Sequence, residues 1–296
     1  MLLRKIKICL TVSLLFIATF SFGQARIGIS GTVEWDKMKM NALISLDLAS
    51  AGLKLPAGRT QGEALITSEY LRLIRPNILN IQVDSSTVLS DLVGRGEWTL
   101  AEVEDLAIQA RAVPPALSPD FSMLTASYSL DITGILKAHI HHQRPSDIPR
   151  TLIPVSAPAY TGIIIIASGT LPAHGMNTGA VVRPCLFPKI WDTGMNLIFE
   201  KNMLNPQTGA MARYFPMKDI FAGGPSGLSR EIAAVVGNRP LRIFARGVFG
   251  VTPTDPIIGS EDALLIISSE ENRSLLREGK VVIILEDAML KNSLGE

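Results

Sequence analysis

The chain has 296 residues, of which 47% are hydrophobic and 19% are charged. These are ordinary globular proportions, so they exclude an intrinsically disordered chain and allow either one large domain or two modest ones. The formal net charge of +1 at pH 7 argues against a strongly basic nucleic-acid-binding protein and against an acidic tail protein.

The first 23 residues have the layout of a secretory signal peptide. Three basic side chains within the first seven residues precede a largely apolar stretch that ends at Phe22, and Gly23 and Ala25 offer two cleavage positions. The apolar stretch is short for a bilayer-spanning helix, which needs about 20 residues. We therefore expect residues 24–296 to be periplasmic or secreted, with an uncleaved membrane anchor as the alternative.

The next segments favour two strands followed by two helices. Alternating apolar residues predict strands over 27–35 and 38–48, joined by a tight turn. A helical spacing of apolar residues begins at Gly58, and Pro76 is expected to end this helix near Ile74. A second helix is predicted to begin at Thr99, because Glu102 completes a capping box, and to stop before the prolines at 114 and 115.

The clearest alternation in the chain extends from Leu124 to Ile140. Every second residue there is apolar or small, and all but one of the intervening residues are polar. Because successive side chains of a strand point to opposite faces, this pattern predicts a long strand with one wet face. The proline-containing stretch 143–158 that follows is expected to be a loop and offers a domain boundary.

The second half predicts a mixture of buried strands and short helices. The expected strands are 162–167, 190–199 (as a pair), 241–248, 263–267 and 281–285, and the expected helices begin at Ser229 and at Ser268 or Ser269. Residues 169–188 and 202–227 are expected to be irregular. The fold class is therefore α+β, with a mixed, partly antiparallel curved sheet and three to four helices on one face.

Histidines near the end of the long predicted strand are the candidate metal ligands. His139 and His141 share one strand face, and His174 could complete the three protein ligands of a catalytic zinc site. Solvated histidines at a strand end are the competing interpretation, and we favour it. The sequence therefore predicts no cofactor, with metal binding or a metal-dependent hydrolase as the alternative function.

Other candidate sites have similarly simple explanations. Asp84 and the three hydroxyl residues after it suggest a hydrolase, but they also suit a turn in which side chains bond to local backbone. Cys185 is the only cysteine after the signal segment and is expected to be a small buried residue rather than a nucleophile. A binding pocket lined by Phe187, Trp191 and Phe199 is a third hypothesis.

Several stretches together resemble a family of flagellar accessory proteins. The stretches are Arg59 to Tyr70, Ile81 to Val88, Tyr160 to Ala167 and Pro184 to Asp192. They resemble the N-terminal domain of flagellar assembly protein T and the related small outer-membrane lipoproteins. The resemblance implies an envelope-associated α+β domain that assembles with other proteins and has no catalytic residues. Unlike the lipoproteins, this chain has no cysteine at its cleavage position.

Taken together, these features predict a non-enzymatic envelope protein. The expected role is structural or in assembly, with a flagellar accessory component as one version. The expected partners are other envelope or flagellar proteins, or further copies of the chain, and not nucleic acid. Contact with the membrane is expected only through the N-terminal signal segment.

Overall fold

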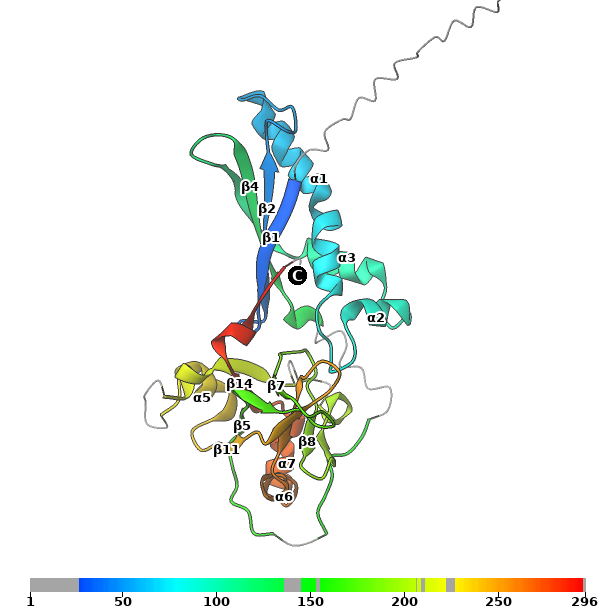
Figure 1. The fold of residues 1–296 in the computed structure, drawn as a ribbon, viewed down its shortest axis with the longest axis vertical. Helices are drawn as coiled ribbons and strands as arrows, with labels where there is room; N and C mark the ends of the chain where they lie inside the picture. The colour runs from blue at the N-terminus through cyan, green and yellow to red at the C-terminus, as the bar shows by residue number, and fades with distance from the viewer. Residues whose placement is uncertain are drawn as a thin grey trace, which may run out of the picture.

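The computed structural model describes residues 27–135, 145–152, 155–205, 207–208, 211–221 and 227–294. The predicted signal segment, His139 and His141 therefore lie outside the described residues. The strands and helices form two regions that follow each other along the chain, and Figure 1 shows them as an upper and a lower part. Both regions combine helices with strands, which confirms the predicted α+β class.

The first region is built on a five-stranded antiparallel sheet. Its strands, in spatial order, are β15 (Lys291–Ser293), β1 (Ile27–Glu34), β2 (Lys39–Asp47), β4 (Met123–Asp131) and β3 (Arg111–Leu117). The two predicted N-terminal strands are confirmed, and they pair from Ile27 opposite Leu46 to Glu34 opposite Lys39. The edge strand β15 comes from the other end of the chain, so the last described residues complete the first sheet.

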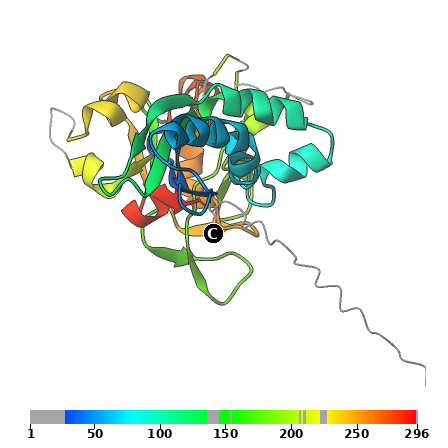
Figure 2. The same ribbon diagram turned by 90° about the horizontal axis from the view of Figure 1, so that it is seen from above.

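One face of this sheet is covered by helix α1 (Ala57–Leu79), beside which lie α2 (Leu89–Gly94) and α3 (Leu100–Ile108), as Figures 1 and 2 show. The prediction that α1 ends before Pro76 is wrong, because the helix contains this proline. Ile66, Tyr70, Ile74 and Ile78 are all buried at four-residue spacing. The apolar face therefore continues past Pro76, and its packing outweighs the backbone hydrogen bond that the proline lacks.

The predicted start of α3 is confirmed in atomic detail. The Glu102 backbone N–H donates to Thr99 Oγ1 at 3.2 Å, and the Thr99 backbone N–H donates to Glu102 Oε2 at 2.8 Å. The prolines at 114 and 115 lie in β3, a strand that the sequence analysis missed. Proline is tolerated there because β3 is an edge strand and is interrupted by a register shift between Val113 and Ala116.

The long strand predicted over 124–140 is shorter in the structure. Strand β4 ends at Asp131, whose Oδ1 accepts hydrogen bonds from the Thr133 backbone N–H at 2.9 Å and from the Thr133 hydroxyl at 2.7 Å. These bonds turn the chain into a helical segment at 133–135, and Ile132 and Ile135 remain buried. The alternating pattern therefore continues beyond the strand that it predicts, and residues 136–140 lie outside the described part.

The second region is centred on a parallel sheet. Its strands, in spatial order, are β10 (Arg213–Pro216), β14 (Val281–Leu285), β5 (Ile163–Ile166) and β11 (Leu241–Phe244). Every residue of β5 and β14 is buried, as expected for central strands of a parallel sheet. The predicted buried strands around 162–167 and 281–285 are confirmed, whereas β10 lies in a stretch that was expected to be irregular.

Three short helices accompany this sheet. Helix α5 (Arg230–Val236) is capped by Ser229, and α7 (Glu270–Arg277) is capped by Ser269, as predicted. The strand predicted over 263–267 is wrong, because these residues belong to helix α6 (Ser260–Ile267). Only Ala263 and Ile266 of that apolar run are buried, and this spacing of three residues belongs to a helix.

A smaller sheet and a hairpin complete the described fold. The sheet has the order β12 (Gly247–Phe249), β13 (Asp255–Ile258), β8 (Ile190–Asp192) and β9 (Leu197–Phe199), and it confirms the predicted strand pair over 190–199. Strands β6 (Thr170–Pro172) and β7 (Gly179–Val181) form a hairpin in a stretch that was expected to be loop. Short 3-10 helices occupy Lys201–Met203, Met217–Phe221 and Asp287–Leu290.

Candidate functional site at the junction of the two regions

The C-terminal strand joins the two regions along one seam. Strand β15 pairs with β1, with Thr32 opposite Ser293 and Val33 opposite Asn292. The Trp35 backbone N–H also donates to the carbonyl oxygen of Leu290 at 2.9 Å. The chain thus leaves the second region at β14 and ends in the sheet of the first, as the red strand in Figure 1 shows.

A second seam forms beyond the end of α1. The backbone N–H of Leu186 donates to Gln82 at 3.0 Å, and that of Phe187 donates to Val83 at 2.8 Å. The Thr252 backbone N–H donates to the carbonyl oxygen of Ser85 at 2.8 Å. The segment after α1 is therefore held by main-chain hydrogen bonds to two loops of the second region.

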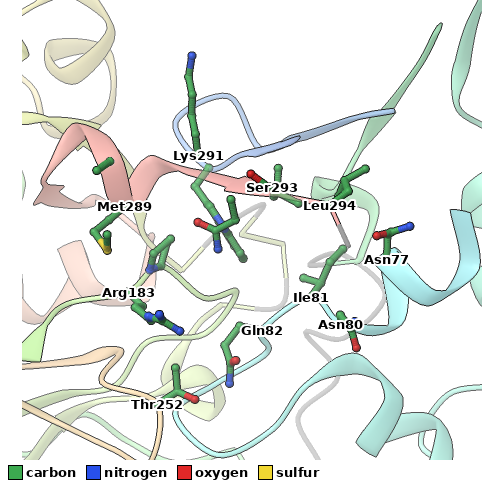
Figure 3. A pocket seen from close by; sticks show the side chains of 15 residues that line it. Asn77, Asn80, Ile81, Gln82, Arg183, Thr252, Met289, Lys291, Ser293 and Leu294 are labelled. Carbon is green, nitrogen blue, oxygen red and sulfur yellow. The ribbon is translucent and has the colours of Figure 1, made fainter. Parts of the chain in front are cut away.

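A pocket of about 510 Å³ lies between the two seams. Figure 3 shows its side chains, which come from β1, the end of α1, two loops of the second region and β15 with the turn before it. The lining residues are Val33, Trp35, Asn77, Asn80, Ile81, Gln82, Arg183, Pro184, Thr252, Ala288, Met289, Lys291, Asn292, Ser293 and Leu294. This volume lies within the range of roughly 300–1,000 Å³ that is typical of small-molecule sites.

The charged side chains that line the pocket are positive. Among the described residues, Arg183 and Lys291 are the only charged ones that line it, and no aspartate or glutamate of these ranges does so. Lys291 extends away from the other labelled side chains in Figure 3, and its Nζ lies 3.8 Å from Glu34 Oε1. No described carboxylate lies within ion-pair distance of Arg183. The guanidinium of Arg183 is therefore the cation that the pocket offers to a ligand.

Side-chain amides supply most of the other polar groups. The Asn77 side-chain amide donates to the carbonyl oxygen of Leu73 at 3.1 Å, and that of Gln82 donates to Asp84 at 2.6 Å. These bonds fix the orientation of both amides by anchoring their nitrogens. Asn80 and Asn292 are exposed at the pocket, so their amides are accessible to a ligand. Such groups can both donate and accept hydrogen bonds.

Trp35 forms a buried part of the pocket wall. This side chain is 2% exposed, and its ring meets the edge of Tyr214 at a centroid distance of 6.1 Å. Tyr214 is itself buried, and it forms hydrogen bonds with Cys185, which lies two residues after Arg183. Its hydroxyl donates to the carbonyl oxygen of Cys185 at 2.8 Å and accepts from the Cys185 backbone N–H at 3.1 Å. These contacts fix the loop that carries Arg183.

The buried groups beside this wall are structural. Burial raises the pKa of the Cys185 thiol, and its position confirms the interpretation of Cys185 as a small buried residue. Burial also raises the pKa of Asp255, although its Oδ1 accepts bonds from the Lys189 backbone N–H at 3.1 Å and the Thr254 hydroxyl at 2.9 Å. Neither Cys185 nor Asp255 is among the described residues that line the junction pocket.

The hydroxyl cluster after Asp84 is a turn, as the simpler interpretation predicted. The Ser86 backbone N–H and hydroxyl donate to Asp84 Oδ1 at 2.9 and 3.1 Å. Ser85 and Thr87 are buried. The cluster therefore shapes the second seam, and the Ser85 side chain also forms a hydrogen bond with the buried carboxyl group of Asp255.

The candidate metal ligands are not brought together within the described part of the chain. His174 is exposed and contacts Phe249 edge-to-face, and the other two candidates, His139 and His141, lie outside the described residues. Across the described ranges, no group of three or more histidine, cysteine, aspartate or glutamate side chains is arranged to hold a metal ion.

The three aromatic residues expected to line a pocket are separated. Phe187 lines a second, smaller cavity of about 200 Å³, where Lys201 Nζ lies 5.3 Å from its ring centre. Trp191 contacts Phe249 at 5.5 Å, and Phe199 is completely buried. The larger pocket was missed because its residues come from five separate segments, and no local spacing marks them.

Comparison with known families identifies both regions. Residues 26–138 match the family model described as Treponema pallidum Tp0624, N-terminal domain. Residues 162–287 match the model described as Treponema pallidum Tp0624, second domain. The two matches follow each other along the chain as the two domain descriptions do, and they coincide with the two regions of the fold.

The similarity to Tp0624 corrects the expected family. The resemblance to flagellar assembly protein T is wrong, because the short structural stretches that suggested it belong to regions that match the Tp0624 domains. Those stretches are part of a helix, two short strands, a turn and a loop, which are features that recur in unrelated proteins. A search of curated proteins finds no match. Within the described residues, no helix has both the length and the apolar character that a membrane span requires.

Proposed function

We propose that this chain is an exported, non-enzymatic protein of the cell envelope that acts in assembly by binding a partner through its five-stranded sheet. The observation that carries this proposal is the sheet face opposite α1. Apolar residues of β2 and β4 point toward the helix. The residues between them, which are polar except for Leu43 and Met123, point to the other side, which is open among the described residues.

This open face has an unusual composition. Strand pairing aligns short hydroxyl and amide side chains across it, and Asn41 and Ser129 are joined by a hydrogen bond of 2.8 Å. The aligned polar residues are Ser30, Thr32, Asn41, Ser45, Thr125, Ser127, Ser129 and Ser293. Short side chains lose little conformational entropy when covered, so a flat surface of this kind suits a protein partner.

The positions of the potentially reactive side chains also support a binding role. The Cys185 thiol and the Asp255 carboxylate are buried, and Ser86 is engaged in a turn. The chain uses these groups to shape the junction between its two regions. A protein whose two regions are fixed in this way presents a constant surface to a partner.

The proposed binding face can be tested by cysteine cross-linking. Ser127 lies on the open face and is exposed, so S127C in a C9S background provides an accessible thiol, whereas Cys185 is buried. We expect S127C to form a specific cross-linked product in intact cells. S68C, at an exposed serine of α1, is the matched control. Equal cross-linking of both variants, or none with either, would contradict the proposal.

The proposed export has its own test. N-terminal sequencing of the protein purified from its native cells should find a chain that starts after Gly23 or after Ala25. A chain that retains Met1 in the cytoplasmic fraction would contradict export. This outcome is independent of the cross-linking result, so the location and the binding face can fail separately.

A further inference from the structure

We propose that the junction pocket binds a small ligand that carries one carboxylate on a polar body rich in hydroxyl or amide groups. The Arg183 guanidinium would bind the carboxylate, and the amides of Asn80 and Asn292 would bind the body. This inference goes beyond the proposed assembly role, and it stands on the pocket alone.

The charges of the lining residues favour an anionic group on the ligand. The sequence has 27 acidic residues and 28 basic ones, yet none of the acidic residues that the structure describes lines the pocket. The Lys291 ammonium is directed elsewhere and faces Glu34, so a single cation remains in the pocket. A planar guanidinium pairs well with a carboxylate because two parallel hydrogen bonds fit both groups.

The remaining lining selects against a simple inorganic anion. Figure 3 shows Arg183 near Gln82 and Thr252 on one side of the pocket, and Asn77 and Leu294 lie on the other side. Most of the volume of about 510 Å³ is therefore bordered by amides, hydroxyls and apolar surface, and not by further cations. A phosphate ion would occupy a small part of this space, whereas a larger polar ligand would contact both sides.

The pocket is also placed where a ligand would matter. Its walls belong to β1, the end of α1 and β15 on one side, and to loops of the second region on the other. A bound ligand would contact both regions at once. Because it would bind the joined arrangement and not separated regions, it would stabilise the junction by an amount that grows with the logarithm of its concentration above Kd.

Calorimetric titration of the full chain with two probes tests this proposal. The probes are D-glucuronate and N-acetylglycylglycine, which share a carboxylate but differ in carrying hydroxyls or amides. Glucose and inorganic phosphate are the comparison arms. We expect saturable binding of at least one carboxylate probe, with a Kd on the order of 1 mM for so small a ligand. Glucose and phosphate should bind at least about tenfold more weakly.

Three variants locate the binding. R183Q should weaken binding of the carboxylate probe by at least about tenfold, because it removes the charged half of the pair. N292A should weaken it less. K291Q removes a cation that points away from the pocket, so its Kd should stay within about twofold of the unmodified protein. All three positions are exposed, and circular dichroism verifies the fold.

Three results would overturn the proposal. The first is no binding of either carboxylate probe up to about 10 mM, a concentration well above the expected Kd. The second is equal binding of phosphate and the probes, which would indicate a general anion site. The third is equal weakening by R183Q and K291Q, which would indicate a diffuse positive potential. None of these results bears on the cross-linking test of the open sheet face.

Discussion

The carbonyl oxygen of Gly31 accepts a hydrogen bond from the backbone N–H of Leu294, at a distance of 2.9 Å. This bond joins the beginning of the described chain to its end. Gly31 also has a φ of +151° and lies so close to β2 that a Cβ atom built on it would be 2.0 Å from the carbonyl oxygen of Asn41. The position therefore requires glycine for two separate reasons.

Replacing this glycine should destabilise the protein. We expect G31A to lower the free energy of unfolding by about 2–4 kcal/mol, because the added methyl group must push β1 away from β2 and strains the backbone. Gly28, in the same strand, has nothing within 4 Å of the corresponding position. Urea unfolding should find G28A within about 0.5 kcal/mol of the unmodified protein. Similar losses for both variants would refute the steric explanation.

The hydroxyl of Tyr214 should be worth more than an average hydrogen bond. It satisfies both the carbonyl oxygen and the backbone N–H of Cys185, and all of these groups are buried. Y214F would leave both unpaired, and we expect a loss of about 1–3 kcal/mol in unfolding free energy. Y128F is the control, since Tyr128 is only partly buried and the change preserves its stacking on Tyr70. Unchanged stability of Y214F would contradict the assignment.

The thiol of Cys185 should be protected in the folded protein. It is 1% exposed, and burial raises its pKa, so both access and the reactive thiolate are limited. In a C9S background, iodoacetamide at pH 8 should modify Cys185 far more slowly in buffer than in denaturing urea. Mass spectrometry measures the extent of modification. Rapid modification in buffer would reopen the possibility of a nucleophilic role.

Acid should weaken the ion pairs of α7 in a defined pH range. Hydrogen bonds from Arg277 and Arg273 lower the pKa of Glu270 to about 2 from its ordinary value near 4.5. A depressed carboxyl pKa contributes stability that is present above the unfolded-state pKa and is lost as the pH falls toward the folded-state value. The stability difference between the unmodified protein and E270Q should therefore shrink between about pH 4.5 and pH 2.

This pH-dependent difference should be small at neutral pH. Glu270 is exposed, so solvent screens its ion pairs, and we expect E270Q to cost at most about 1 kcal/mol at pH 7. Urea unfolding at several pH values measures the difference. E278Q is the control, since Glu278 has one exposed ion pair with Lys280. A difference for E270Q that grows as the pH falls would contradict the assigned sign.

Local chemistry made some elements predictable and left others hidden. The caps at Thr99, Ser229 and Ser269 are read correctly because a cap depends on side chains within three residues of it. The buried run of β5 is also read correctly, since its solid apolar character needs no partner to be recognised. The equally apolar run in α6 is misread as a strand, because a short run of this kind fits either structure.

Elements that depend on distant partners could not be predicted. Helix α1 continues past Pro76 only because Ile78 finds a buried position, and β3 exists only because β4 lies beside it. The same limit applies to the junction pocket. Arg183 and Asn292 have no shared motif in the sequence, and only the return of β15 to the first sheet brings them to one cavity.

The pairing of β15 with β1 also means that the first sheet can be completed only after the second region has been synthesised. A ribosome that has finished β4 has made four of the five strands of the first sheet, yet the fifth is still about 160 codons away from translation. Until then, the nascent chain has an incompletely covered β1, whose free N–H and C=O groups can pair with a neighbouring polypeptide. The sheet of the first region is therefore completed only after the second region has been translated. Premature termination anywhere before Lys291 leaves the β1 edge of the sheet unpaired.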